Sequence, residues 1–169
     1  GFAPLKNYNY KNLFDWMLLL DDVNSRSNVV PHLAGYYYTQ TQNKKDLIHI
    51  INYLEQHAER DFDNKWWWLA QSFMIAKKDY QDNNMALYFA YKLANRSTDD
   101  MPLWVKQLPA FIYSDMGESC IAFSIIKNLM DDHDSGKRVL TSYEMEIMRH
   151  FIKDRLGKLK DEKFDPRKC

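Results

Sequence analysis

Apolar residues recur at helical spacing along most of this chain. In the first such stretch they are Leu13, Phe14, Met17, Leu18 and Leu20. Intervals of three and four residues bring side chains to one side of an α-helix. The same periodicity returns after short polar segments. It predicts helices over residues 10–23, 29–41, 46–59, 66–77, 85–95, 102–114, 119–130 and 141–159.

Polar and proline residues mark where these helices begin or bend. We expect Asn28 to cap the second helix with its side-chain oxygen, since Pro31 near the start needs no backbone donor. Thr141 and Glu144 have the spacing of a capping box at the last helix. Pro109 lies inside the helix predicted over 102–114 and is expected to kink it.

The helices fall into a repeating pattern. The pairs separated by 36 residues are Leu33 and Leu69, Ala58 and Ala94, Arg60 and Arg96, Asp63 and Asp99, and Trp68 and Trp104. Repeats of this length typically stack as helical hairpins. We therefore predict an all-α, right-handed α-solenoid of about four antiparallel hairpins, forming a single domain over residues 10–159. Its parts are an extended lead-in (1–9), repeats at about 28–62, 63–99 and 100–131, flanking helices at 10–23 and 141–159, and a flexible tail (160–169).

Composition and charge narrow the possible functions. With 46% hydrophobic residues among 169, the chain is typical of a folded protein and not of a disordered one. Lys plus Arg and Asp plus Glu are equal at 23 each, so the formal net charge is zero. This balance offers no general attraction for nucleic acid or anionic lipid. The sequence as given contains no uninterrupted run of about 18 apolar residues, the length that a membrane-spanning helix needs.

The cysteine, histidine and acidic residues of the sequence are better explained by structural roles than by metal binding or catalysis. Cys120 is interpreted as a small core residue and Cys169 as part of a loose tail, since two cysteines make no disulfide framework. For a metal site we considered His49, His57, Glu55 and Glu59, and the Asp131–Asp134 segment. Two histidines eight residues apart do not ligate one ion unaided, so we expect a solvated helix face. Asp131–Asp134 lacks the ligand pattern of a calcium loop and is expected to be a surface loop.

No catalytic motif is recognisable. The sequence contains no GxSxG, no glycine-rich phosphate loop and no Cys/His pair in a familiar context. We therefore predict that the protein is not an enzyme and uses no cofactor or metal.

The central hairpin carries a family resemblance. In the tetratricopeptide pattern, a bulky residue, a leucine and a small residue on the first helix pack against small residues on the second. The matching positions here are Trp66, Leu69, Ala70 and Phe73, followed by Ala86 and Ala90. The chain thus resembles a degenerate tetratricopeptide-like solenoid over roughly 100 residues.

A narrower likeness comes from the order of WWWLA, KKDY and MPLWVKQLPAF. This succession resembles a poorly characterised bacterial group of tetratricopeptide proteins that carry one N-terminal membrane anchor. The resemblance implies that such an anchor precedes this chain and that the chain is extracytoplasmic. A cytoplasmic location remains the alternative.

The resemblance also implies a groove that binds a peptide or helix of another protein. Its positions, transferred to this register, are Asn28, Tyr38, Asn64, Trp67, Gln71, Met74, Lys106 and Tyr113. Consecutive helical residues point about 100° apart, so the tryptophan triplet does not share one face, and Trp67 is the one expected to be exposed. His32, Trp68 and Gln107 stand where a carboxylate clamp would need asparagine, so an apolar or helical ligand is favoured.

Two other functions remain open. The chain is also consistent with a structural subunit of a membrane-associated complex or a homo-oligomer. A third alternative is an enzyme or small-molecule binder on a helical scaffold, for which a deep pocket holding two or more ionisable residues would be evidence.

Overall fold

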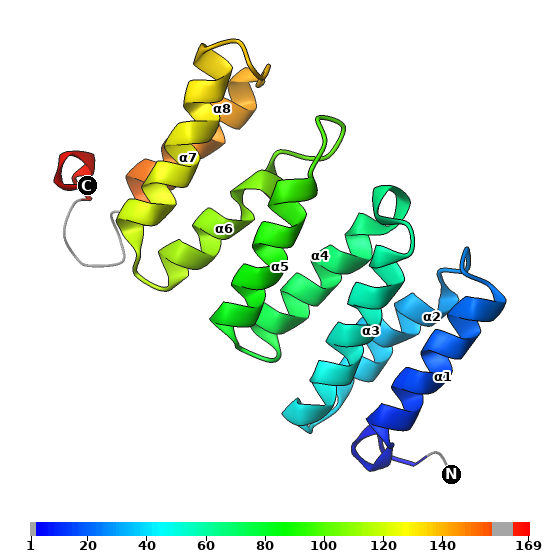
Figure 1. Ribbon diagram of the computed structural model, residues 1–169. Helices are drawn as coiled ribbons and strands as arrows, with labels where there is room; N and C mark the ends of the chain where they lie inside the picture. The colour runs from blue at the N-terminus through cyan, green and yellow to red at the C-terminus, as the bar shows by residue number, and fades with distance from the viewer. Residues whose placement is uncertain (1–2, 157–163) are drawn as a thin grey trace. The chain divides into compact units, whose positions relative to one another are not determined.

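The computed structural model describes residues 3–156 and 164–169 (Figure 1). Within these ranges the chain forms helices and turns without a β-strand, which confirms the all-α class. Residues 157–159 of the last predicted helix and 160–163 of the predicted tail lie outside the described residues. The chain divides into two compact units, 1–89 and 90–169. The predicted single repeat domain stays a prediction.

Unit 1 contains the N-terminal helices. A 3₁₀ turn (Leu5–Asn7) precedes α1 (Tyr10–Val23). α2 (Val29–His32) continues as a π-helical turn (Leu33–Tyr37) and a 3₁₀ turn (Tyr38–Gln40). A further 3₁₀ turn (Lys44–Asp46) leads into α3 (Leu47–Glu59), and α4 (Phe62–Lys78) follows. α5 (Asn83–Arg96) begins in unit 1 and ends in unit 2.

The core of unit 1 is built around α3, which packs against both α1 and α4. Its side chains Ile50, Ile51, Leu54 and Ala58 are buried, as the spacing of three and four residues predicts. The π-helical turn packs against α3 and α4. A Cβ atom added at Gly35 in this turn would touch Leu54 and the Trp68 ring at 3.8 Å, so the helices approach closely here.

Unit 2 contains α6 (Trp104–Asp115), α7 (Ser119–Asp134) and α8 (Ser142–His150), which continues as a π-helical turn (Phe151–Arg155). A 3₁₀ turn (Pro166–Lys168) lies near the C-terminus. α7 packs against α6 and α8. The buried side chains of this unit include Leu103, Ala110, Ile126, Met145 and Met148.

Several predicted boundaries hold and others were wrong. The capping box of Thr141 and Glu144 is confirmed. Pro109 lies within α6, which runs on to Asp115. The predicted loop at 131–134 was wrong: these residues are the last turn of α7, which ends at Asp134 with Ser135 as its C-cap, and the next residue, Gly136, has a φ of +74°. A glycine in this left-handed conformation is a common helix terminator.

Asn28 precedes α2, but its side chain makes no capping hydrogen bond. The predicted capping role was therefore wrong. Its Oδ1 instead accepts a hydrogen bond from Trp68 Nε1 at 3.3 Å, because α4 lies alongside and a buried indole N–H needs an acceptor.

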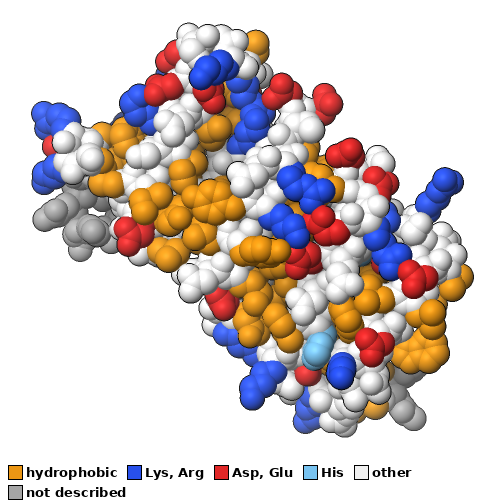
Figure 2. All heavy atoms as spheres, viewed as in Figure 1, with side chains coloured by type: hydrophobic (Ala, Val, Ile, Leu, Met, Phe, Trp, Pro, Cys, Tyr) orange, Lys and Arg blue, Asp and Glu red, His pale blue; other side chains and the backbone are white. Residues whose placement is uncertain are grey.

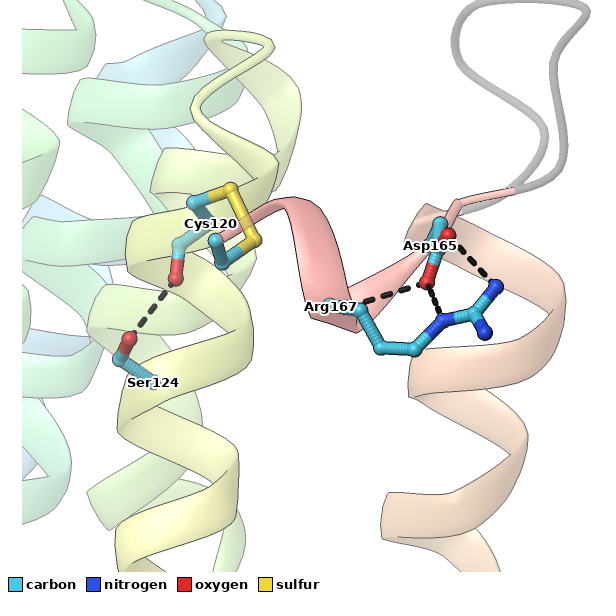
Figure 3. The surroundings of a disulfide bond; sticks show 5 residues. Cys120, Ser124, Asp165 and Arg167 are labelled. Carbon is cyan, nitrogen blue, oxygen red and sulfur yellow. Dashed lines mark hydrogen bonds and ion pairs between the residues drawn. A yellow bond between two sulfur atoms is a disulfide. The ribbon is translucent and has the colours of Figure 1, made fainter.

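The interpretation of the two cysteines was also wrong. Cys120 is exposed near the start of α7 and forms a disulfide with Cys169, 49 residues later (Figure 3). Phe164 also lies against α7, with its ring 5.6 Å from that of Phe123. In the same segment, Arg167 donates two side-chain hydrogen bonds to Asp165, and these lower the pKa of the Asp165 carboxyl. Residues 164–169 are thus held to α7 by a covalent bond and an aromatic contact.

Candidate partner-binding face

An open hollow of about 610 Å³ lies on the surface of unit 1. It is lined by Asn28, Val29, His32, Leu33, Tyr36 and Tyr37. These residues share a side of α2 and the π-helical turn, while Pro31, Ala34 and Gly35 point into the core. The lining contains no Lys, Arg, Asp or Glu side chain. Its volume falls in the range of about 300–1,000 Å³ that is usual for ligand sites.

α4 continues this surface. Gln71 Nε2 donates a hydrogen bond of 2.6 Å to the Tyr36 hydroxyl, and the buried Trp68 ring meets the His32 ring edge-on at 4.8 Å. Trp67 and Met74 are four and three residues from Gln71, so they lie on the same side of α4. We call the hollow together with Trp67, Gln71 and Met74 the aromatic face.

Four of the predicted groove residues therefore belong to one surface: Asn28, Trp67, Gln71 and Met74. Trp67 is 48% exposed and Trp68 only 5%, which confirms that the triplet divides between surface and core. Of the residues that carry the family resemblance, Trp66 is only partly buried, and the others are buried: Leu69, Ala70, Phe73, Ala86 and Ala90.

Two predicted groove residues of unit 1 have other surroundings. Tyr38 is half-buried; its backbone oxygen accepts a hydrogen bond from Tyr10, and burial raises the pKa of its hydroxyl. Asn64 is exposed and donates to the carboxylate of Asp61 at 3.0 and 3.1 Å. Neither lines the hollow.

The remaining two predicted residues, Lys106 and Tyr113, belong to α6 in unit 2. Both are partly buried. The Tyr91 hydroxyl donates a long hydrogen bond of 3.5 Å to that of Tyr113. Burial, together with this contact, raises the pKa of Tyr91 to about 12.

Unit 1 also contains a buried polar cluster that sequence reasoning missed. Asp21 of α1 is 1% exposed and accepts a 2.9 Å hydrogen bond from the Tyr53 hydroxyl. His57 Nδ1 lies 2.6 Å from the other carboxylate oxygen, and its Nε2 has no hydrogen-bond partner in the described part of the chain. Arg60 Nε is 4.0 Å away. His57 was expected on a solvated helix face, but it is fully buried, so this expectation was wrong. The carboxylate that it contacts comes from α1, and the sequence of α3 alone does not reveal it.

This cluster predicts a pH dependence at alkaline pH. Burial, and then the hydrogen bond to Asp21, raise the pKa of Tyr53 above its ordinary value of 10.0. Folded Tyr53 therefore keeps its proton where the unfolded chain loses it, so its contribution to stability is full below pH 10 and is lost as the pH rises beyond that value. We expect the free energy of unfolding, measured by urea denaturation from pH 9 to 11, to fall less steeply in Tyr53→Phe than in the wild type. Equal slopes would contradict this assignment.

A second apolar surface lies on α1. Trp16, Leu19, Leu20 and Val23 are between 48% and 79% exposed, and their spacing of three and four residues forms one stripe. Figure 2 shows hydrophobic side chains at the surface over this helix. This stripe is separate from the α1 residues that are buried against the core, Tyr10, Met17 and Asp21.

Unit 2 has a half-enclosed pocket of about 310 Å³. Its lining residues are Asp99, Met101, Gly136, Lys137, Arg138, Val139, Leu140 and Glu144. The Glu144 carboxylate is held by the capping box, and Arg138 and Lys137 lie 3.8 and 3.6 Å from Asp99 and Asp132. The pocket thus contains ionisable residues, but each of these has an opposite charge or a capping bond beside it.

In the described residues, no group of three or more His, Cys, Asp or Glu side chains is placed to hold a metal ion. None of the described helices combines the length and apolar character needed to cross a membrane. Scans of protein-family models, curated proteins and solved structures find no match for this chain.

Proposed function

We propose that this protein is a non-enzymatic interaction module, a scaffold that binds a peptide or helix of a partner protein at the aromatic face. The observation that carries the proposal is the open hollow of about 610 Å³ on unit 1, continued by the half-exposed Trp67. Exposed aromatic side chains around a hollow are typical of sites that bind other molecules, because they offer large contact areas at small entropic cost.

The proposed architecture is a right-handed tetratricopeptide-like solenoid of helical hairpins. It is supported by the alternation of α2 with α3, α4 with α5 and α6 with α7, joined by short turns. The sequence repeat of 36 residues adds to this support. In this arrangement the first helices of successive hairpins would carry the binding surface.

The proposed location is extracytoplasmic. The disulfide between Cys120 and Cys169 supports it, because disulfides form and persist in oxidising compartments and are rare in the cytosol. The resemblance to the membrane-anchored bacterial group points the same way.

Trp67→Ala tests the binding face. We expect this variant to bind the partner at least about tenfold more weakly, because aromatic residues at the centre of an interface contribute a large share of the binding energy. The measurement is the dissociation constant of the purified partner, first captured with the wild-type chain and then titrated against each variant.

The matched control is Tyr143→Ala. Tyr143 is also a well-exposed aromatic residue, 74% accessible, but it lies on α8 in unit 2. The control should bind as the wild type does. Unchanged affinity in Trp67→Ala would refute the binding face.

A structural subunit is the second candidate, favoured by the exposed stripe on α1. Four apolar side chains at helical spacing form a surface that could pack permanently against a membrane partner or a second copy. Light scattering measures the mass of the protein in solution and so tests whether the stripe packs against a second copy. A monomeric, monodisperse protein would count against that packing.

A further inference from the structure

The hydrogen bonds around the hollow determine which polar groups remain for a ligand. Trp68 Nε1 is a donor, so the Asn28 side chain must present its oxygen to it, as the 3.3 Å contact shows. The Asn28 amide nitrogen is left with no partner among the described residues. Gln71 donates to the Tyr36 oxygen, so the Tyr36 hydroxyl proton is also left to donate. The Tyr37 hydroxyl also lines the hollow, so three neutral donor groups remain there.

His32 supplies the complementary group. Its Nδ1 lies 2.6 Å from the backbone oxygen of Asn28, which can only accept, so Nδ1 carries the proton. In the neutral ring, Nε2 is then an acceptor. The hollow therefore offers three donor groups and the His32 ring nitrogen as an acceptor between apolar walls.

These groups suit an extended ligand better than a helix. Every backbone group in the middle of a helix is already hydrogen-bonded within the helix, so the backbone of a helix would cover these donors without satisfying them. A polyproline II segment has no internal hydrogen bonds, and its carbonyls are free to accept. Because proline lacks the N–H group, a proline-rich segment presents more acceptors than donors, which matches the excess of donors in the hollow.

The walls of the hollow point to the same ligand. Tyr36 and Tyr37 are each about half exposed, and Val29 and Leu33 lie beside them. Flat aromatic rings with nearby hydroxyl and amide donors are the usual surface for proline rings and polyproline carbonyls. The lining contains no Lys, Arg, Asp or Glu, so it offers no opposite charge to a charged segment.

From these contacts we infer that the hollow on α2 and the π-helical turn binds an extended, proline-rich, uncharged segment of the partner. This inference rests on the proposed function and specifies the chemistry of the bound segment.

The test is isothermal titration calorimetry of the full chain with three uncharged probe peptides. They are decaproline, a glycine–serine decapeptide, and a helix-forming peptide of alanine, leucine and glutamine. Decaproline should bind saturably and more tightly than the other two. Tyr36→Phe keeps the ring and removes the hydroxyl, which is both the free donor and the acceptor for Gln71, so it should weaken decaproline binding about threefold to tenfold. Tyr36→Ala should weaken it further.

Tyr143→Phe on α8 removes a hydroxyl far along the chain and should leave decaproline binding unchanged. Circular dichroism establishes that each variant is folded before titration. Decaproline binding no tighter than the glycine–serine peptide, or equal in wild type and both Tyr36 variants, overturns the inference.

Calorimetry with the probe peptides and titration of the captured partner together separate this inference from the proposed function. If the helical peptide binds better than decaproline and Trp67→Ala weakens it, the extended ligand is wrong and the binding face stands. If the authentic partner binds Trp67→Ala as well as wild type, the binding face itself fails.

Discussion

Asp21→Ala is expected to lower the free energy of unfolding of unit 1 by about 2–6 kcal/mol, because it leaves two buried donors without an acceptor at a cost of about 1–3 kcal/mol each. Asp21 accepts from Tyr53 and lies 2.6 Å from His57 Nδ1, and all three side chains are buried. Without the carboxylate, two buried donors lose their acceptor in a place that water does not reach. Urea denaturation measures the loss, and limited proteolysis detects it if the variant is too unstable to titrate.

Two variants separate this effect from a general sensitivity of α1. Asp15→Ala removes an exposed carboxylate from the same helix and should change stability by less than about 0.5 kcal/mol. Tyr53→Phe removes one donor while leaving the carboxylate in place, and should cost about 1 kcal/mol. An Asp21→Ala variant as stable as Asp15→Ala would show that the cluster does not hold α1 to α3.

Reduction of the disulfide between Cys120 and Cys169 is expected to destabilise unit 2 by about 2–4 kcal/mol. The bond joins residues 49 apart and thereby restricts the unfolded chain, and it also fixes the C-terminal turn to α7. Denaturant unfolding with and without a phosphine reductant measures the difference. The rate of amide hydrogen exchange in residues 164–169 should rise on reduction. Without the disulfide, this segment loses its covalent link to α7 and keeps the contact between Phe164 and Phe123.

The control is the double variant Cys120→Ser with Cys169→Ser, which avoids an unpaired thiol. It should resemble the reduced wild type and should not respond to reductant. Identical unfolding midpoints for oxidised and reduced wild type would contradict a stabilising role for the bond.

The features that could be predicted from the sequence depend on local geometry. The periodicity of apolar residues located the helices, and the 100° rotation between neighbours separated the exposed Trp67 from the buried Trp68. The Thr141 capping box was also recognisable, since both partners lie within one turn. The end of α7 could have been placed better, because Gly136 is a standard terminator and was available as a signal.

What could not be predicted depends on residues that meet only in the folded chain. Asn28 has the character of a helix cap, but Trp68, 40 residues later, takes its oxygen. His57 shares a helix with polar residues, and its burial depends on Asp21, 36 residues earlier. Cys120 and Cys169 carry no spacing motif, so only the path of the chain brings them together. In each case the local preference was outweighed by a tertiary contact.

The central claim is that a partner protein contacts the aromatic face of unit 1. It is tested most directly by photo-crosslinking, with a benzophenone amino acid placed at Tyr37 in the hollow or at Tyr143 on α8, in cells that produce the partner. The account predicts a covalent adduct with another polypeptide from position 37 and none from position 143. No adduct from position 37 in the folded protein, or equal adducts from both positions, would contradict it.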